Sequence, residues 1–108
     1  MDRALFIAQR LTALVLAPMV AAHLIGIVYA IHGGLTMAGI LGRTKGSVLL
    51  GAFYCLFVLM AAIHSSIGLR NVLTEWTSID SRAIAWAMSL LGVLLIAIGL
   101  RAVAAVVM

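Results

Sequence analysis

The sequence predicts an all-α integral membrane protein of three transmembrane helices, which form part of a larger helical bundle. Of its 108 residues, 66% are hydrophobic and only 9% are charged. A soluble domain of this size cannot hide so much apolar surface, because small domains bury only about 60% of the surface that the unfolded chain exposes. In a membrane, lipid can surround this apolar surface, so the chain does not need to bury it. Three apolar segments are also too few strands for a closed barrel, so helices are the expected spanning elements.

Each helix is predicted from a long run without Asp, Glu, Lys or Arg. These runs are Leu11–Leu41, Gly46–Leu69 and Ala83–Leu100. Each run reaches or approaches the roughly 20 residues that an α-helix needs to cross about 30 Å of hydrocarbon. We expect a single membrane domain, 1–108, with helices at about 8–31, 46–72 and 82–104.

Two short polar segments separate the predicted helices. Glycines and basic residues mark the first loop, and the second loop contains plausible N-cap residues for the third helix. The first group is Gly33, Gly34, Gly42, Arg43, Lys45 and Gly46, and the second group is Ser78, Asp80 and Ser81.

The basic residues near the helix ends predict the orientation in an inner (cytoplasmic) membrane. Four arginines fall on one side and two basic residues on the other, while Arg101 is ambiguous. Since cytoplasmic loops carry the excess of Lys and Arg, the N-terminus is expected inside and the C-terminus outside. The larger group is Arg3, Arg10, Arg70 and Arg82, and the smaller is Arg43 and Lys45.

Several classes of protein are excluded by what the sequence contains. The net charge is +4, but the basic residues are scattered singly, so no nucleic acid is expected as a partner. Cys55 is the only cysteine, which excludes an intrachain disulfide and a structural zinc site. The apolar run after Asp2 and Arg3 is too long for a signal peptide. No phosphate loop, carboxylate pair or nucleophile–base pair is visible, so we expect no catalysis by this chain alone.

Two histidines within the predicted spans are the candidate metal ligands. His23 falls in the middle-to-late part of the first helix, and His64 falls in the second half of the second helix. Ionisable groups inside a membrane are costly and usually functional. Neutral imidazole is a common ligand of haem iron, and a helical bundle readily encloses haem. The alternative is that each histidine only hydrogen-bonds across helices.

The depth of each histidine indicates that they do not share one haem. His23 is thirteen residues from Arg10, or roughly 20 Å, and His64 is six residues from Arg70, or roughly 9 Å. Both arginines are expected near the inner surface. We therefore predict two haems b, stacked across the membrane, with each histidine paired to a ligand from a partner chain.

Further residues are candidates for the cofactor surroundings. Arg10 and Arg70 could pair with haem propionates or a quinone carbonyl, or simply extend to the interface. Trp76 could line a quinone pocket or belong to the interfacial aromatic belt, as Trp86 does. His32 is expected at the outer interface, where it needs no special role. Small residues near the histidines permit close approach of a macrocycle or of a neighbouring helix; they are Ala21, Ala22, Gly26, Ser65, Ser66 and Gly68.

Two segments resemble the membrane-anchor (cytochrome b) subunits of the succinate dehydrogenase and fumarate reductase family. The first is Gln9-Arg10-Leu11-Thr12-Ala13, followed by His23. The second is His64-Ser65-Ser66-Ile67-Gly68-Leu69-Arg70 and its continuation to Trp76. In that family an H-x-x-x-G-[LIM] pattern carries the haem ligand, which corresponds to His64. The family has single-haem, two-haem and haemless members, and the spacing from Gln9 to His23 is similar to that of the two-haem form.

The resemblance implies a role in a four-part complex. His64 would serve the proximal haem, nearer the iron–sulfur subunit, and His23 the distal one. A flavoprotein subunit would oxidise succinate or reduce fumarate, and this chain and a second membrane anchor would hold haem b and a quinone site in membrane lipid. Many single-haem members have a quinone-contacting tyrosine where Trp76 stands.

Three other functions are compatible with parts of this pattern. One is a b-type anchor of another membrane oxidoreductase, such as a hydrogenase or formate dehydrogenase. Another is a haem-free structural membrane subunit whose histidines only pack. The third is a small efflux-type transporter, which would require a carboxylate buried in the first helix; Asp2, Glu75 and Asp80 all lie outside the predicted spans.

Overall fold

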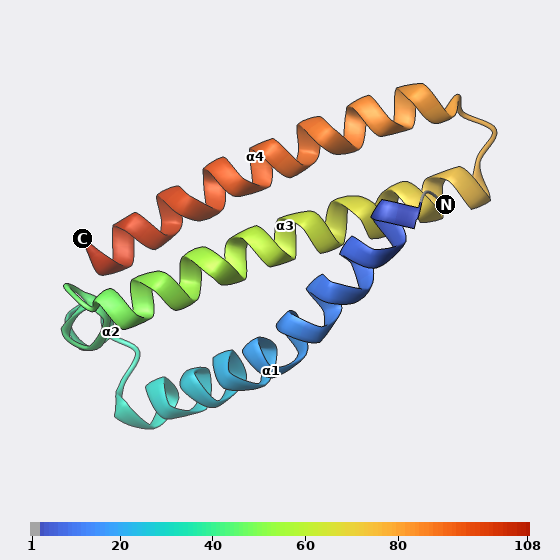
Figure 1. Ribbon diagram of the computed structural model, residues 1–108. Helices are drawn as coiled ribbons and strands as arrows, with labels where there is room; N and C mark the ends of the chain where they lie inside the picture. Colours follow the sequence, from blue (N-terminus) through green and yellow to red (C-terminus); the bar gives the residue numbers. More distant parts are fainter. Residues whose placement is uncertain (1–2) are drawn as a thin grey trace.

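The computed structural model describes residues 3–108, and this part of the chain folds into helices joined by short connections (Figure 1). Three of the helices are long, and each is long and apolar enough to span a membrane. Between the first two long helices lies one short helix. The bounds are α1, Arg3–Gly33; α2, Met37–Thr44; α3, Val48–Trp76; and α4, Ser81–Val107. The expected all-α membrane fold is confirmed.

The long helices run antiparallel in chain order, with α3 in the centre (Figure 1). Helix α3 packs against α1 on one side and against α4 on the other. The N-terminus and the α3–α4 connection lie at one end of the bundle, and α2 and the C-terminus lie at the other (Figure 1). Three crossings therefore place the two ends of the chain at opposite ends of the bundle.

Small residues let α3 and α4 pack closely. A Cβ built on Gly92 would lie 2.9 Å from the Ser66 Oγ, and one built on Gly99 would lie 2.5 Å from the Val58 Cγ1. Gly92 and Gly99 are one heptad apart, so they repeat on the same face of α4. Without a hydrophobic driving force between helices in lipid, such close backbone approach is a principal source of association.

Helix α1 approaches α3 closely in its first half and diverges from it in its second half (Figure 1). Pro18 lies inside this helix. A proline in a helix interior removes one hydrogen bond to the preceding turn and clashes with a carbonyl there, which bends the helix. Thr12 and Met19, one heptad apart, are the buried residues of α1. The residues after His23 are mostly exposed.

The short helix α2 falls where the sequence predicted only a loop. Its N-cap is Thr36, whose hydroxyl accepts a hydrogen bond from the Gly39 N–H at 3.0 Å. Its last residue, Thr44, donates to the Val106 carbonyl at 2.6 Å, and the Gly46 N–H donates to the Val107 carbonyl at 2.7 Å. These bonds attach α2 to the C-terminal end of α4.

The surface of the described chain is strongly apolar. Large hydrophobic side chains are exposed along all three long helices; Leu14 and Ile25, for example, are 72% and 70% exposed. Burying such surface requires lipid or other helices, because contiguous exposed apolar area is disfavoured in water. The structure is therefore that of an integral membrane protein. Its buried side chains are Thr12, Met19, Ala62, Ile67, Ile84 and Val103.

Candidate cofactor site

The facing surfaces of α1 and α3 carry both candidate histidines. At one level the Gln9 amide lies 3.1 Å from where a Cβ on Gly68 would be, and Thr12 contacts His64. At another level His23 contacts Tyr54. These contacts define one antiparallel register along the whole α1–α3 seam.

The two histidines lie at clearly different levels of the bundle. His64 is level with Thr12, whereas His23 is level with Tyr54. Tyr54 and Phe57, the two rings that His23 contacts, lie ten and seven residues before His64, which corresponds to roughly 10–15 Å of helix. Two axial ligands of one iron must lie at the same level, on opposite sides of the macrocycle. The separation expected from the spacing to Arg10 and Arg70 is present in the fold.

His64 has a buried polar neighbour. Its Nδ1 lies 3.2 Å from the Oγ1 of Thr12, a residue that is only 4% exposed. The Thr12 hydroxyl also lies 2.8 Å from the Ala8 carbonyl and 3.0 Å from the Gln9 carbonyl, both on its own helix. Among the described residues, no hydrogen bond is formed by the His64 Nε2. That nitrogen is the one available to a ligand.

His23 has aromatic neighbours in place of a polar one. Its ring meets Tyr54 edge-on at 6.0 Å between centroids and Phe57 at 5.3 Å with a tilt of 54°. Neither ring nitrogen of His23 forms a hydrogen bond within residues 3–108. The imidazole is therefore positioned by packing, and both nitrogens remain available.

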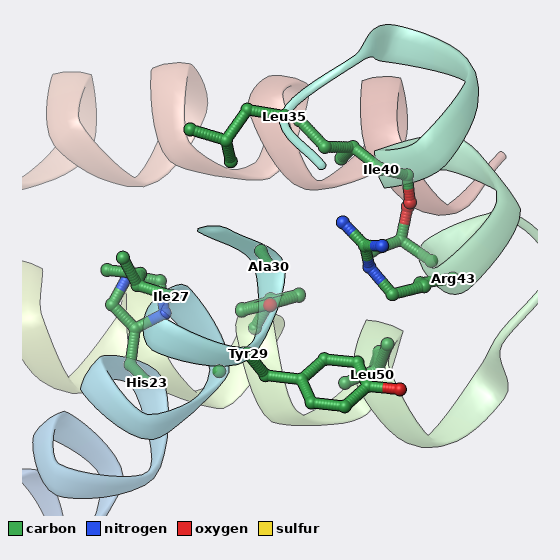
Figure 2. A pocket seen from close by; sticks show the side chains of 11 residues that line it. His23, Ile27, Tyr29, Ala30, Leu35, Ile40, Arg43 and Leu50 are labelled. Carbon is green, nitrogen blue, oxygen red and sulfur yellow. The ribbon is translucent and has the colours of Figure 1, made fainter. Parts of the chain in front are cut away.

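His23 also lines a cavity of about 550 Å³ between α1, α2 and α3. Figure 2 shows His23 and Arg43 at opposite ends of this cavity, with Tyr29 between them. The guanidinium of Arg43 donates to the Gly34 carbonyl at 3.2 Å and lies 5.9 Å from the centre of the Tyr29 ring. The other lining residues are mainly aliphatic: Gly26, Ile27, Ala30, Leu35, Ile40, Thr44, Leu50 and Tyr54.

The remaining candidate residues cluster at the His64 end of the bundle. Arg10 is exposed, with its guanidinium 5.6 Å from the centre of the Phe6 ring. Arg70 is half-buried and forms no ion pair with the described residues. Trp76 is the last residue of α3 and is 82% exposed. None of these three side chains is fully buried within this chain, so each can reach a ligand or the membrane interface.

His32 differs from the other two histidines. It is exposed, and its Nδ1–H donates to the Val28 carbonyl of its own helix at 2.9 Å. This bond satisfies the Nδ1 of His32 within its own helix.

The surroundings of His64 and His23 fit haem better than a bare metal ion. Residues 3–108 contain no group of three or more His, Cys, Asp or Glu side chains that could hold a metal ion. Haem needs far less from the protein, because the macrocycle supplies four ligands and a histidine supplies an axial one. Each histidine has a free nitrogen, and both are half-buried. The two histidines therefore meet what haem requires of an axial ligand from the protein.

Several residues of this arrangement were not singled out as functional from the sequence. Thr12, Tyr54 and Phe57 contact the candidate histidines, and Arg43 reaches into the His23 cavity. Thr12 stands inside the Gln9–Ala13 segment that carries the family resemblance, which was the available signal. The other contacts depend on the register between two helices, and helix spacing alone does not define that register.

The fold and the two histidines thus define the chain as a small helical membrane subunit with candidate axial ligands at two levels. The sequence model of the succinate dehydrogenase/fumarate reductase transmembrane subunit family matches residues 1–104. The chain belongs to this family. Comparison with curated proteins and with solved structures found no match.

Proposed function

We propose that this chain is a haem b-binding membrane anchor subunit that passes electrons between an iron–sulfur subunit and membrane quinone. The observation that carries the proposal is the pair of half-buried histidines, His23 and His64, on the seam between α1 and α3. An imidazole inside a membrane span is costly unless it has a role, and ligation of haem iron is the role that its chemistry suits. Membership of the family supports this assignment.

The roughly 10–15 Å between the levels of the two histidines supports two haems rather than one. His64 would ligate the haem nearer the iron–sulfur subunit, and His23 would ligate the distal one. Haem b, when bound, would accept and release single electrons. A second membrane anchor would supply the opposite axial ligands and would cover apolar surface that this chain leaves exposed.

The basic residues at the His64 end support the same arrangement. Arg10 and Arg70 have no carboxylate partner among residues 3–108, so either guanidinium can pair with a haem propionate or a quinone carbonyl. Trp76 would line the quinone site or anchor α3 at the interface. The N-terminal end would face the inside of an inner (cytoplasmic) membrane, where the positive-inside rule places Arg3, Arg10 and the basic residues of the α3–α4 end. Flavoprotein and iron–sulfur subunits would complete the complex on that side.

The test is a haem count on the purified complex for wild type, His23→Ala and His64→Ala. A pyridine haemochrome assay gives the amount, and a dithionite-reduced minus oxidised spectrum shows which haem remains. We expect two haems b per complex in the wild type, with each substitution removing a different one. The matched control is His32→Ala, because His32 is exposed and satisfied by its own helix; it should retain both haems.

Two results would contradict the proposal. A single haem that only His64→Ala removes would leave His23 as a packing residue and would reduce the electron path to one centre. A complex without haem would leave this chain only the role of a membrane anchor.

A further inference from the structure

The hydroxyl of Thr12 is the only polar contact of His64 among residues 3–108, and the hydrogen of this hydroxyl already bonds elsewhere. Threonine in a helix commonly donates to the carbonyl four residues earlier. Here the Thr12 Oγ1 lies 2.8 Å from the Ala8 carbonyl, which can only accept. If the hydroxyl hydrogen pointed at His64 instead, two oxygens would face each other at 2.8 Å with no hydrogen between them.

Because the hydroxyl of Thr12 has only one hydrogen, the direction of that hydrogen determines the tautomer of His64. Since Thr12 gives its hydrogen to α1, its oxygen has only lone pairs to offer the Nδ1 of His64, 3.2 Å away. The hydrogen between them must then belong to the imidazole, on Nδ1. A neutral imidazole with its hydrogen on Nδ1 has its lone pair on Nε2.

We propose that Thr12 is a positioning residue for His64: its hydroxyl accepts the Nδ1–H, fixes the ring orientation and keeps the Nε2 lone pair available to haem iron. This inference rests on the proposed function, in which His64 is an axial ligand. Ligating histidines generally donate their other N–H to an acceptor, which sets the tautomer and raises the basicity of the ligand. In this chain the acceptor comes from a different helix, so it also couples ligand orientation to the packing of α1 on α3.

The structure around Thr12 suits a fixed acceptor. The residue is 4% exposed, so water does not compete effectively for the bond. Its β-branched side chain has restricted rotation about χ1, and the bond to Ala8 holds the hydroxyl in one direction. One turn earlier, the Gln9 side chain lies over Gly68, where the missing side chain allows α1 to approach α3.

The experiment compares Thr12→Val, which keeps the shape but removes the hydroxyl, with Thr12→Ser, which keeps the hydroxyl. Ser89→Ala is the matched control, because Ser89 is an exposed hydroxyl that bonds the Ala85 carbonyl of its own helix. The readouts are the rate and extent of haem transfer from the intact complex to apomyoglobin, and the midpoint potential of each haem in a redox titration.

We expect Thr12→Val to weaken haem binding at the His64 level by about 10- to 100-fold, as is typical when the hydrogen-bond partner of a ligating histidine is lost. The potential of that haem should rise, because a less basic imidazole stabilises the ferric state less. The His23 haem should be unchanged, and Thr12→Ser and Ser89→Ala should both behave as wild type.

Three results would overturn the inference. Thr12→Val could bind haem as tightly as wild type and at the same potential, which removes any role for the hydroxyl. Thr12→Ser could fail as Thr12→Val does, or both haems could be lost together, and either result would make Thr12 a packing residue. If His64→Ala leaves the haem content of the complex unchanged, the proposed function and this inference are both wrong. This variant is therefore measured before any Thr12 variant is compared.

Discussion

His64 and His23 lie on the same helix seam, yet the chain holds them in different ways. His64 meets a buried hydroxyl across the seam, at 3.2 Å. His23 meets two aromatic rings and opens onto a cavity of about 550 Å³. One imidazole is therefore oriented by a hydrogen bond and the other by packing, although the sequence presents both simply as a histidine in an apolar helix.

The difference follows from how closely α1 and α3 approach at each level. Near His64, Gly68 lets the Gln9 side chain lie against the backbone of α3. In its second half α1 diverges from α3, and α2 lies at that end of the bundle (Figure 1). Where α1 and α3 lie close together, a direct hydrogen bond can form between them. Where they diverge, large rings fill part of the space and a cavity remains. Both candidate sites offer an imidazole, so they differ in the separation of α1 and α3 and not in the type of side chain.

The strongest test of this comparison adds bulk to each level separately. Gly68→Leu should push Gln9 away and separate α1 from α3 next to His64, which removes most of the haem at that level and spares the other. Gly26→Leu should remove the haem at the His23 level and spare the other, because Gly26 lines the cavity one turn after His23 and a leucine there would fill the space beside the imidazole. The amount of each haem is read from reduced minus oxidised spectra.

Gly42→Leu is the control for this pair. Gly42 lies in α2 but does not line the cavity, and a Cβ there meets nothing within 4 Å. It should retain both haems. If Gly68→Leu and Gly26→Leu removed the same haem, the division of the seam into two independent sites would be wrong.

An intermediate effect is expected from Tyr54→Leu. Tyr54 contacts the ring of His23 edge-on, so its loss should let the imidazole rotate while leaving it in reach of iron. We expect the distal haem to stay bound and its low-spin electron paramagnetic resonance signal to shift, because that signal depends on the relative orientation of the axial rings.

The control for Tyr54→Leu is Phe53→Leu, which removes a neighbouring ring that contacts Tyr54 and Phe57 but not His23. The signal of the His64 haem should be the same in both variants. An unchanged distal signal in Tyr54→Leu would mean that packing by this ring does not orient His23.

The smallest effect is expected from Arg43→Gln. The substitution removes the bond from the guanidinium to the Gly34 carbonyl and the contact with Tyr29, which together join α2 to the end of α1. Losing an exposed hydrogen bond costs about 1 kcal/mol. Amide hydrogen exchange of residues 37–44 should therefore be faster by roughly fivefold, since 1.36 kcal/mol corresponds to a factor of ten.

Lys45→Gln removes the same charge from the next exposed basic residue, so it separates the loss of charge from the loss of the contacts. It should leave exchange in α2 near the wild-type rate. Equal acceleration in both variants would show that charge, and not the Arg43 contacts, holds the cavity wall in place.

Much of the architecture could be predicted from the sequence because it depends on composition. Three uncharged runs in a chain with 66% hydrophobic residues require three membrane helices, whatever their packing. The different levels of His23 and His64 could also be predicted, since the rise of a helix per residue is constant. The family could be identified from the His64–Arg70 pattern, and the match over residues 1–104 confirms it.

Helix α2 could not be predicted in this way. It has only eight residues, and isolated helices of that length are marginal in water. Its stability comes from tertiary bonds, in particular from Thr44 to the Val106 carbonyl and from Gly46 to the Val107 carbonyl. These partners are about sixty residues away in the chain, so no local pattern indicates them.

The sequence by itself therefore determined that the chain lies in lipid, the number of long helices and the different levels of the two imidazoles along the bundle. Only the tertiary structure decided what each imidazole meets. The register that brings Thr12 to His64 and Tyr54 to His23 is a property of two helices together, and it includes the close contact of Gln9 with Gly68. Periodicity reports which residues share a face of one helix, whereas the partner of each residue depends on how that face is aligned with the next.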